Sequence, residues 1–158
     1  MRNNRIQGWI AGCCTAALCL LSLFISAQHS TVKTGTLHYE TGNASFYGKT
    51  TLVVTESGNA DLYFEQGLKQ DHYEGHIGAK ELEQLFSKTY DLVNAAPVFA
   101  TRSGKPDESR TQLRWTQGDQ SKELVFWSSE RYNNAALNEL IGLLEQQMKK
   151  ISGGKVKF

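Results

Sequence analysis

Residues 50–66 read TTLVVTESGNADLYFEQ, and this pattern predicts a β-hairpin. Apolar residues recur at every second position on both sides of a short loop, Ser57-Gly58-Asn59, whose residue types favour a tight turn. We therefore expect Thr50–Glu56 and Ala60–Gln66 to pair as antiparallel strands. Side chains on a strand point alternately to the two faces of a sheet, so one face of this hairpin should lie on a core.

The same alternation recurs along the chain and predicts three or four further strands. Thr111–Gln117 and Lys122–Ser128 flank Gly118-Asp119-Gln120 and indicate a second hairpin. Thr36–Thr41 and the short His72–Ile77 are the other candidate strands. In the hairpin strands, the side chains at every second position are apolar and should form the inner face: Leu52, Val54, Leu62, Phe64, Leu113, Trp115, Leu124 and Phe126.

Two segments have the periodicity of amphipathic helices. Ala79–Val93 places apolar side chains three, four and seven residues apart, and Ala135–Ile151 keeps helical spacing throughout. Asn134 is the expected N-cap of the second helix, because its side chain can accept a hydrogen bond from a free N–H of the first turn. Pro97 should end the first helix, because the residue before a proline avoids helical geometry.

These elements predict an α+β fold with the order β-β-β-(β)-α-β-β-α, in which the bracketed strand is His72–Ile77. Strands joined by hairpins, with helices appended, favour an antiparallel sheet of five or six strands that carries both helices on one face. The expected organisation after the leader is a short linker over residues 28–34, a single domain over 35–151 and a flexible tail over 152–158.

The first 27 residues have the composition of an export signal. Two arginines precede an apolar run from Trp9 to Ile25, and Ser26-Ala27 supplies small residues for cleavage. We therefore expect residues 1–27 to be a signal peptide and the protein to be periplasmic or secreted. Residues 9–27 come close to the length of a membrane span, so an uncleaved anchor in the inner membrane is the alternative.

The composition argues against several functional classes. The net charge of the chain is +1 and the only charged residues of the leader are two arginines, so the exported domain is close to neutral. A neutral domain lacks the basic surface expected of a nucleic-acid-binding protein. All three cysteines lie in the leader, so the domain is expected to fold through burial of apolar surface, without a disulfide.

The sequence after the leader has no strong catalytic motif. It contains no cysteine, no serine in a nucleophile-elbow context and no glycine-rich phosphate-binding loop. The chain is therefore predicted to be non-enzymatic and to need no cofactor. One weak metal candidate exists, because His72, Glu74 and His76 would share a face of a strand, and two histidines with a carboxylate can bind zinc. A solvated strand is the simpler interpretation of the same residues.

Aromatic residues indicate a protein-binding surface. Phe46 and Tyr47 lie on the connection Gly42–Gly48 between the first two strands, where rigid rings offer contact area at low entropic cost. Tyr63 and Trp127 alternate with the inner-face positions, so they should point to the outer face of the sheet. Exposed aromatic side chains on such a face can mark a binding site. These four residues are the predicted partner contacts, and ordinary packing of their rings is the alternative.

Four stretches carry a family resemblance: GNASFYG at residues 42–48, GAKEL at 78–82, PDESRT at 106–111 and ALNEL at 136–140. In these stretches and in the order of its elements, the chain over roughly residues 35–150 resembles emfourin-type domains, small bacterial inhibitors of thermolysin-like metalloproteases. The chain departs from that pattern in its export leader and in the polar segment Ala96–Arg110. The resemblance implies the fold and an exported protease as partner, and no inhibitory contact transfers to a particular residue.

We therefore predict an exported, non-catalytic protein-binding module of the protease-inhibitor kind. Two alternatives stay open: a metal-dependent enzyme that uses His72, Glu74 and His76, and a structural envelope protein tethered by its leader. The expected partner is a protein and not a nucleic acid, and contact with a membrane would run only through an uncleaved leader.

Overall fold

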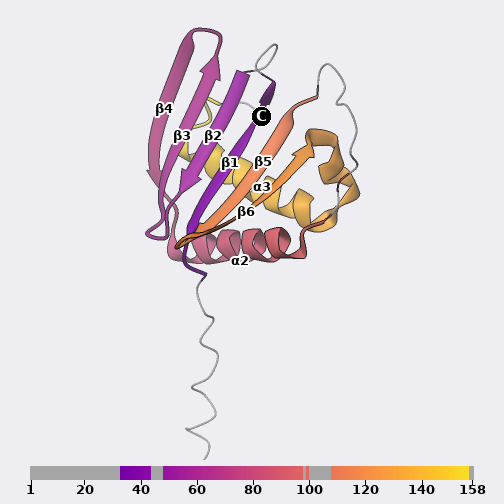
Figure 1. Cartoon of the computed structure of the whole chain (residues 1–158). Helices are drawn as coiled ribbons and strands as arrows, with labels where there is room; N and C mark the ends of the chain where they lie inside the picture. The colour runs from indigo at the N-terminus through magenta and orange to yellow at the C-terminus, as the bar shows by residue number, and fades with distance from the viewer. Residues whose placement is uncertain (1–32, 44–47, 98, 100–107, 157–158) are drawn as a thin grey trace, which may run out of the picture. The chain divides into compact units, whose positions relative to one another are not determined.

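The computed structural model contains one six-stranded antiparallel sheet with helices packed on one of its faces (Figure 1). The structure describes residues 33–43, 48–97, 99 and 108–156. The predicted fold class and order of elements are confirmed. In chain order the elements are β1 (Thr36–Asn43), β2 (Gly48–Val54), β3 (Asn59–Gln66), β4 (Lys69–His76), α2 (Ala79–Ala95), β5 (Arg110–Gln117), β6 (Gln120–Trp127), the 3₁₀ helix η1 (Ser128–Asn133) and α3 (Ala135–Ile151).

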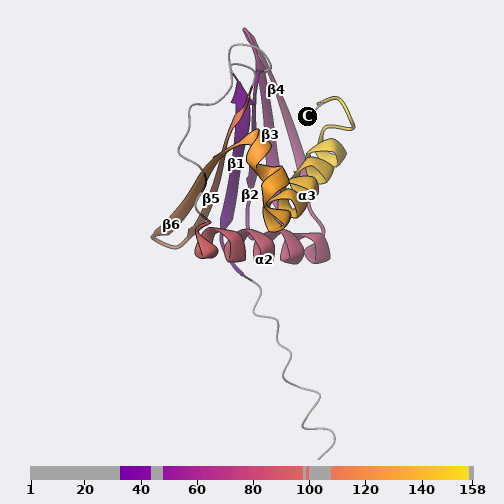
Figure 2. The same ribbon diagram turned by 90° about the vertical axis from the view of Figure 1, so that its right-hand side faces the viewer.

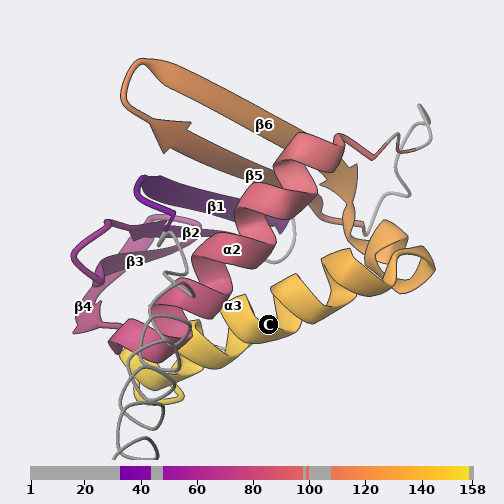
Figure 3. The same ribbon diagram turned by 90° about the horizontal axis from the view of Figure 1, so that it is seen from below.

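The strands are not arranged across the sheet in chain order. The spatial order is β4-β3-β2-β1-β5-β6, so β1 lies in the interior, between β2 and β5. β1 to β4 form an antiparallel meander, and α2 then carries the chain back from β4 to the far side of β1 (Figure 3). The register places Leu52 opposite Leu62 and Leu113 opposite Leu124, which keeps apolar side chains of neighbouring strands on one face.

The core lies between the sheet and the two long helices. Of the eight residues predicted for the inner face, seven are buried and Phe64 packs against them half-buried. Both helices lie on the same side of the sheet (Figure 2), with α2 against β5 and β6 and α3 against β3 and β4. Each helix contributes one buried apolar stripe: Leu82, Leu85, Phe86, Leu92 and Val93 from α2, and Leu137, Leu140, Ile141, Leu144 and Met148 from α3.

β4 is longer than the sequence pattern predicts. It pairs with β3 over its full length, Lys69–His76, after a turn at Gly67 and Leu68 in which Gly67 has a φ of 61°. Most of its side chains are exposed, because β4 is the edge strand of the sheet. An edge strand with few buried side chains lacks the apolar alternation by which strands are recognised, so only its second half was predicted.

The chain stays packed beyond the end of α3. A Cβ atom on Gly75 of β4 would lie 2.8 Å from Cγ1 of Ile151, so glycine allows this end of α3 to approach the sheet closely. Val156, which lies in the segment predicted to be a flexible tail, is 5% exposed and belongs to the core.

The predicted leader, residues 1–27, lies outside the described residues, and its role in export or anchoring stays a prediction. Within the described part of the chain, no helix combines the length and apolar character that crossing a membrane requires.

Asn134 caps α3 as the sequence predicts. Its side-chain oxygen accepts a hydrogen bond from the backbone N–H of Leu137 at 3.0 Å. Replacing Asn134 by alanine should lower the free energy of unfolding by about 1 kcal/mol, because this N–H would lose its partner. Chemical denaturation measures the change, and Asn133→Ala at the exposed neighbouring position should be near neutral. Equal losses in the two variants would contradict the capping role.

Candidate functional site

A cavity of about 310 Å³ lies between the helix-covered face of the sheet, η1 and α3. It is at the end of the sheet where β1 ends and β2 begins, since Gly42 and Gly48 both line it. A cavity of this size can hold a group as large as an aromatic ring. Apolar walls come from Phe64, Phe126 and Ile141, and hydroxyl groups come from Tyr39, Thr41, Thr50, Ser109, Thr111 and Ser128.

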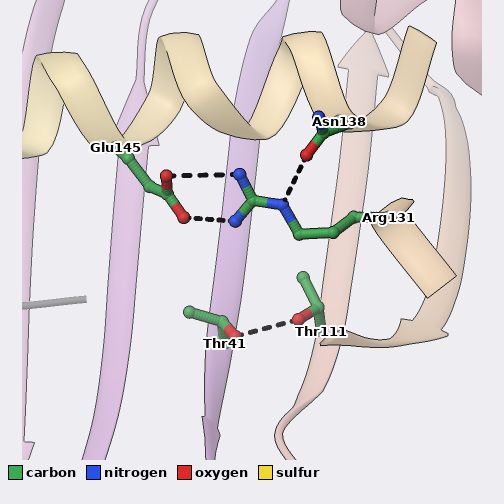
Figure 4. Close-up of polar contacts among 5 residues, drawn as sticks. All are labelled: Thr41, Thr111, Arg131, Asn138 and Glu145. Carbon is green, nitrogen blue, oxygen red and sulfur yellow. Dashed lines mark hydrogen bonds and ion pairs between the residues drawn. The ribbon is translucent and has the colours of Figure 1, made fainter. Parts of the chain in front are cut away.

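One wall of the cavity carries an ion pair between η1 and α3 (Figure 4). Both terminal nitrogens of Arg131 donate to the carboxylate of Glu145, and Nε of Arg131 donates to Oδ1 of Asn138 at 2.9 Å. The hydrogen bond to Glu145 raises the pKa of Arg131 above its ordinary value. The Arg131 side chain is only 18% exposed. Because all three nitrogens of its guanidinium donate hydrogen bonds, the group is held in one orientation.

Hydroxyl groups of β1 and β5 occupy the sheet side of the cavity. Oγ1 of Thr41 and Oγ1 of Thr111 are hydrogen-bonded at 2.8 Å, although 70 positions separate them in the chain (Figure 4). Burial raises the pKa of Tyr39 to about 12, so its phenol stays protonated at neutral pH. The sheet therefore contributes neutral donors and acceptors to the cavity.

This arrangement suits an uncharged, partly apolar ligand group. The charges of Arg131 and Glu145 offset each other, Tyr39 is neutral and the other polar side chains of the lining are hydroxyls. A charged ligand group would lose its hydration here without gaining a counter-ion of its own. Apolar pockets with a few convergent polar groups are a common form of ligand site.

Two glycines shape the end of the sheet beside the cavity. A Cβ atom on Gly42 would lie 2.4 Å from the carbonyl oxygen of Gly48, and Gly48 itself has a φ of +86°. Larger residues at either position would force the backbone to shift. Phe46 and Tyr47, two of the predicted partner contacts, lie in the connection between these glycines and outside the described residues.

Tyr132 is an exposed aromatic residue next to the cavity residue Arg131 in the chain, and it was not predicted from the sequence. It follows the cavity residue Arg131 on η1, and its side chain is 76% exposed. The guanidinium carbon of Arg131 lies 5.6 Å from the centre of the Tyr132 ring. An exposed tyrosine can bury its ring against a protein partner while its hydroxyl stays hydrated. A lone tyrosine between a strand and a helix has no periodic context, so the sequence offered little signal for it.

The other two predicted contacts, Tyr63 and Trp127, lie on the helix-free face of the sheet but far from each other. Tyr63 is on β3 and Trp127 ends β6, so four strand spacings, or about 19 Å, separate them. The Tyr63 ring stacks on the His72 ring, with centroids 4.4 Å apart and planes at 4°. The structure therefore does not combine these two residues into one aromatic patch.

The three metal candidates from the sequence are only partly brought together. Ligand atoms of His72 and Glu74 lie with one of Asp61 in a group whose members are all within 4.8 Å of one another. His76 is not in this group. His76 lies two residues beyond Glu74 on β4, where it pairs with Asn59. Its ring lies against the β2–β3 turn, and a Cβ atom on Gly58 would be 3.0 Å from it. Asp61 was not a candidate from the sequence.

The helix-free face carries cross-strand ion pairs. Oε2 of Glu40 lies 2.9 Å from Nζ of Lys49, and Arg114 donates to Glu123 at 3.1 Å. His38 lies between these pairs, where burial lowers its pKa. Charged side chains of this kind allow a sheet face to remain in contact with water.

A scan of the chain against protein-family models finds no match, and a search of curated proteins also finds no similar sequence.

Proposed function

We propose that this chain is an exported, non-catalytic protein-binding module whose cavity receives an uncharged, partly apolar side chain of the partner. The observation that carries the proposal is the cavity of about 310 Å³. Its lining consists of apolar walls, neutral hydroxyls and one ion pair, Arg131–Glu145, whose charges offset each other. Such a lining favours binding over proton transfer, because its charged groups are already paired and Tyr39 holds its proton at neutral pH.

The surroundings of the cavity favour a protein as the ligand. Tyr132 offers an exposed ring next to a cavity residue, and the connection that contains Phe46 and Tyr47 begins and ends at the lining glycines. A side chain inserted into a pocket, with aromatic contacts around it, is the usual form of a strong contact point in protein complexes. The resemblance to emfourin-type domains favours an exported protease as the partner.

Filling the cavity should abolish partner binding. Ser128 lines the cavity at the start of η1, and Ser128→Phe would place a ring where the partner side chain is expected. Affinity capture from the native envelope fraction should recover a partner with the wild-type protein and lose it with this variant. Ser121→Phe is the matched control, because Ser121 is an exposed serine on β6 outside the cavity.

Circular dichroism should show that both variants fold. Recovery of the same partner by wild type and by a folded Ser128→Phe variant would refute the cavity as the binding site. Loss of the partner with Ser121→Phe alone would place the contact on the helix-free face instead. If binding is retained when Phe46 and Tyr47 are replaced by alanine, the connection Gly42–Gly48 is not part of the interface. The cavity would still be the proposed contact.

A further inference from the structure

Two carboxylates face each other across the β3–β4 pair. Asp61 on β3 is directly opposite Glu74 on β4, and both side chains lie on the helix-free face. Like charges in opposite positions destabilise an antiparallel pair, so this arrangement is unfavourable unless a positive group stands between them. An imidazole nitrogen lies beside them: Nε2 of His72 is 3.0 Å from Oδ1 of Asp61.

The His72 ring is held in place from a second direction. It stacks on Tyr63, its direct cross-strand partner, with ring centroids 4.4 Å apart and nearly parallel planes. The stacking and the contact with Asp61 together orient Nε2 towards Asp61. The three side chains thus present one nitrogen and two carboxylate oxygens within 4.8 Å of one another.

We infer that Asp61, His72 and Glu74 bind a divalent transition-metal ion of the zinc class. One imidazole and two carboxylates suit zinc, whereas calcium and magnesium prefer oxygen ligands alone. Neighbouring ligands on a tetrahedral zinc ion are roughly 3.3 Å apart, so the separation of His72 from Asp61 already fits. The His72 and Asp61 side chains are 39% and 41% exposed, which leaves them free to close around an ion.

The ion would join the edge strand β4 to β3 and leave one coordination position open. Three protein ligands and one open position are typical of zinc sites that bind water or an external group. Binding to the folded state alone raises the free energy of unfolding, so zinc should also stabilise the domain. His76 is not a ligand in this proposed site. The ligand set Asp61, His72 and Glu74 therefore differs from the set His72, Glu74 and His76 that the sequence suggests.

The test uses full-length protein prepared without a polyhistidine tag and titrated with zinc in a calorimeter. We expect one ion per chain, together with a rise in the thermal unfolding midpoint and the visible absorption of a tetrahedral site when cobalt replaces zinc. His72→Gln and Asp61→Asn should each weaken zinc binding by at least about tenfold, because each replaces a ligand by a neutral amide that coordinates zinc poorly. His76→Gln, a histidine on the same strand and face, should bind zinc as the wild type does.

Three results would overturn the inference. The first is the absence of saturable zinc binding by the wild type. The second is unchanged binding by His72→Gln, which would place the metal elsewhere. The third is a loss of binding in His76→Gln with none in Asp61→Asn, which would assign the metal to the two histidines of β4. Far-ultraviolet circular dichroism of each variant distinguishes a lost ligand from a lost fold.

Discussion

Replacing Phe86 by alanine should lower the free energy of unfolding by about 3–5 kcal/mol. The Phe86 side chain is 1% exposed and lies on the buried stripe of α2. Its ring meets the Trp115 ring of β5 edge-to-face at 4.8 Å, so this single side chain joins α2 to the sheet at β5. The variant would lose the buried ring and its aromatic contact. It would also leave a cavity that the rigid sheet cannot close.

Denaturant unfolding of the two proteins under the same conditions measures this loss. A loss of that size is a large share of the total stability expected for a domain of this length. Leu68→Ala is the control, since Leu68 is fully exposed in the β3–β4 turn and should change stability little. A Phe86→Ala variant as stable as the wild type would mean that α2 does not pack on the sheet as described.

Replacing Glu145 by alanine should lower the free energy of unfolding by about 2 kcal/mol. Its carboxylate binds both terminal nitrogens of Arg131, which is 18% exposed and would be left as a largely buried charge without a partner. Breaking a fully buried ion pair costs about 3–5 kcal/mol, and partial exposure of Glu145 reduces the effect here.

Glu139→Ala is the matched control for this prediction. Glu139 is on the same helix and pairs with Lys88 at 2.8 Å, but its side chain is 56% exposed. Exposed pairs contribute about 0–1 kcal/mol, and the change in helix propensity is the same in both variants. Equal effects of Glu139→Ala and Glu145→Ala would contradict a structural role for the Arg131 pair. A double-mutant cycle with Arg131→Met would measure the coupling directly.

The architecture could be predicted from the sequence because it depends on local periodicity. The alternation around residues 50–66 and the helical spacing of Ala135–Ile151 each identify an element and the face that it buries. The spatial order of the strands could not be predicted in the same way. The placement of β1 between β2 and β5 depends on pairings between distant segments, and no local pattern specifies them.

The candidate sites were harder to predict for the same reason. Thr41 and Thr111 meet only because β1 pairs with β5, and Arg131 reaches Glu145 only because η1 turns the chain back over the sheet end. Asp61 was missed as a possible metal ligand because its place beside Glu74 follows from the β3–β4 register. Sequence spacing within one strand suggested His76 instead.

The most direct test of the proposed binding site is photo-crosslinking at Tyr132 in the native envelope. Replacing this exposed tyrosine with a benzophenone amino acid keeps an aromatic side chain beside Arg131. We expect illumination to give one specific adduct with a protein partner. The same group at Glu56, exposed in the turn at the opposite end of the sheet, should give none. An adduct from Glu56 with none from Tyr132 would contradict binding at the cavity.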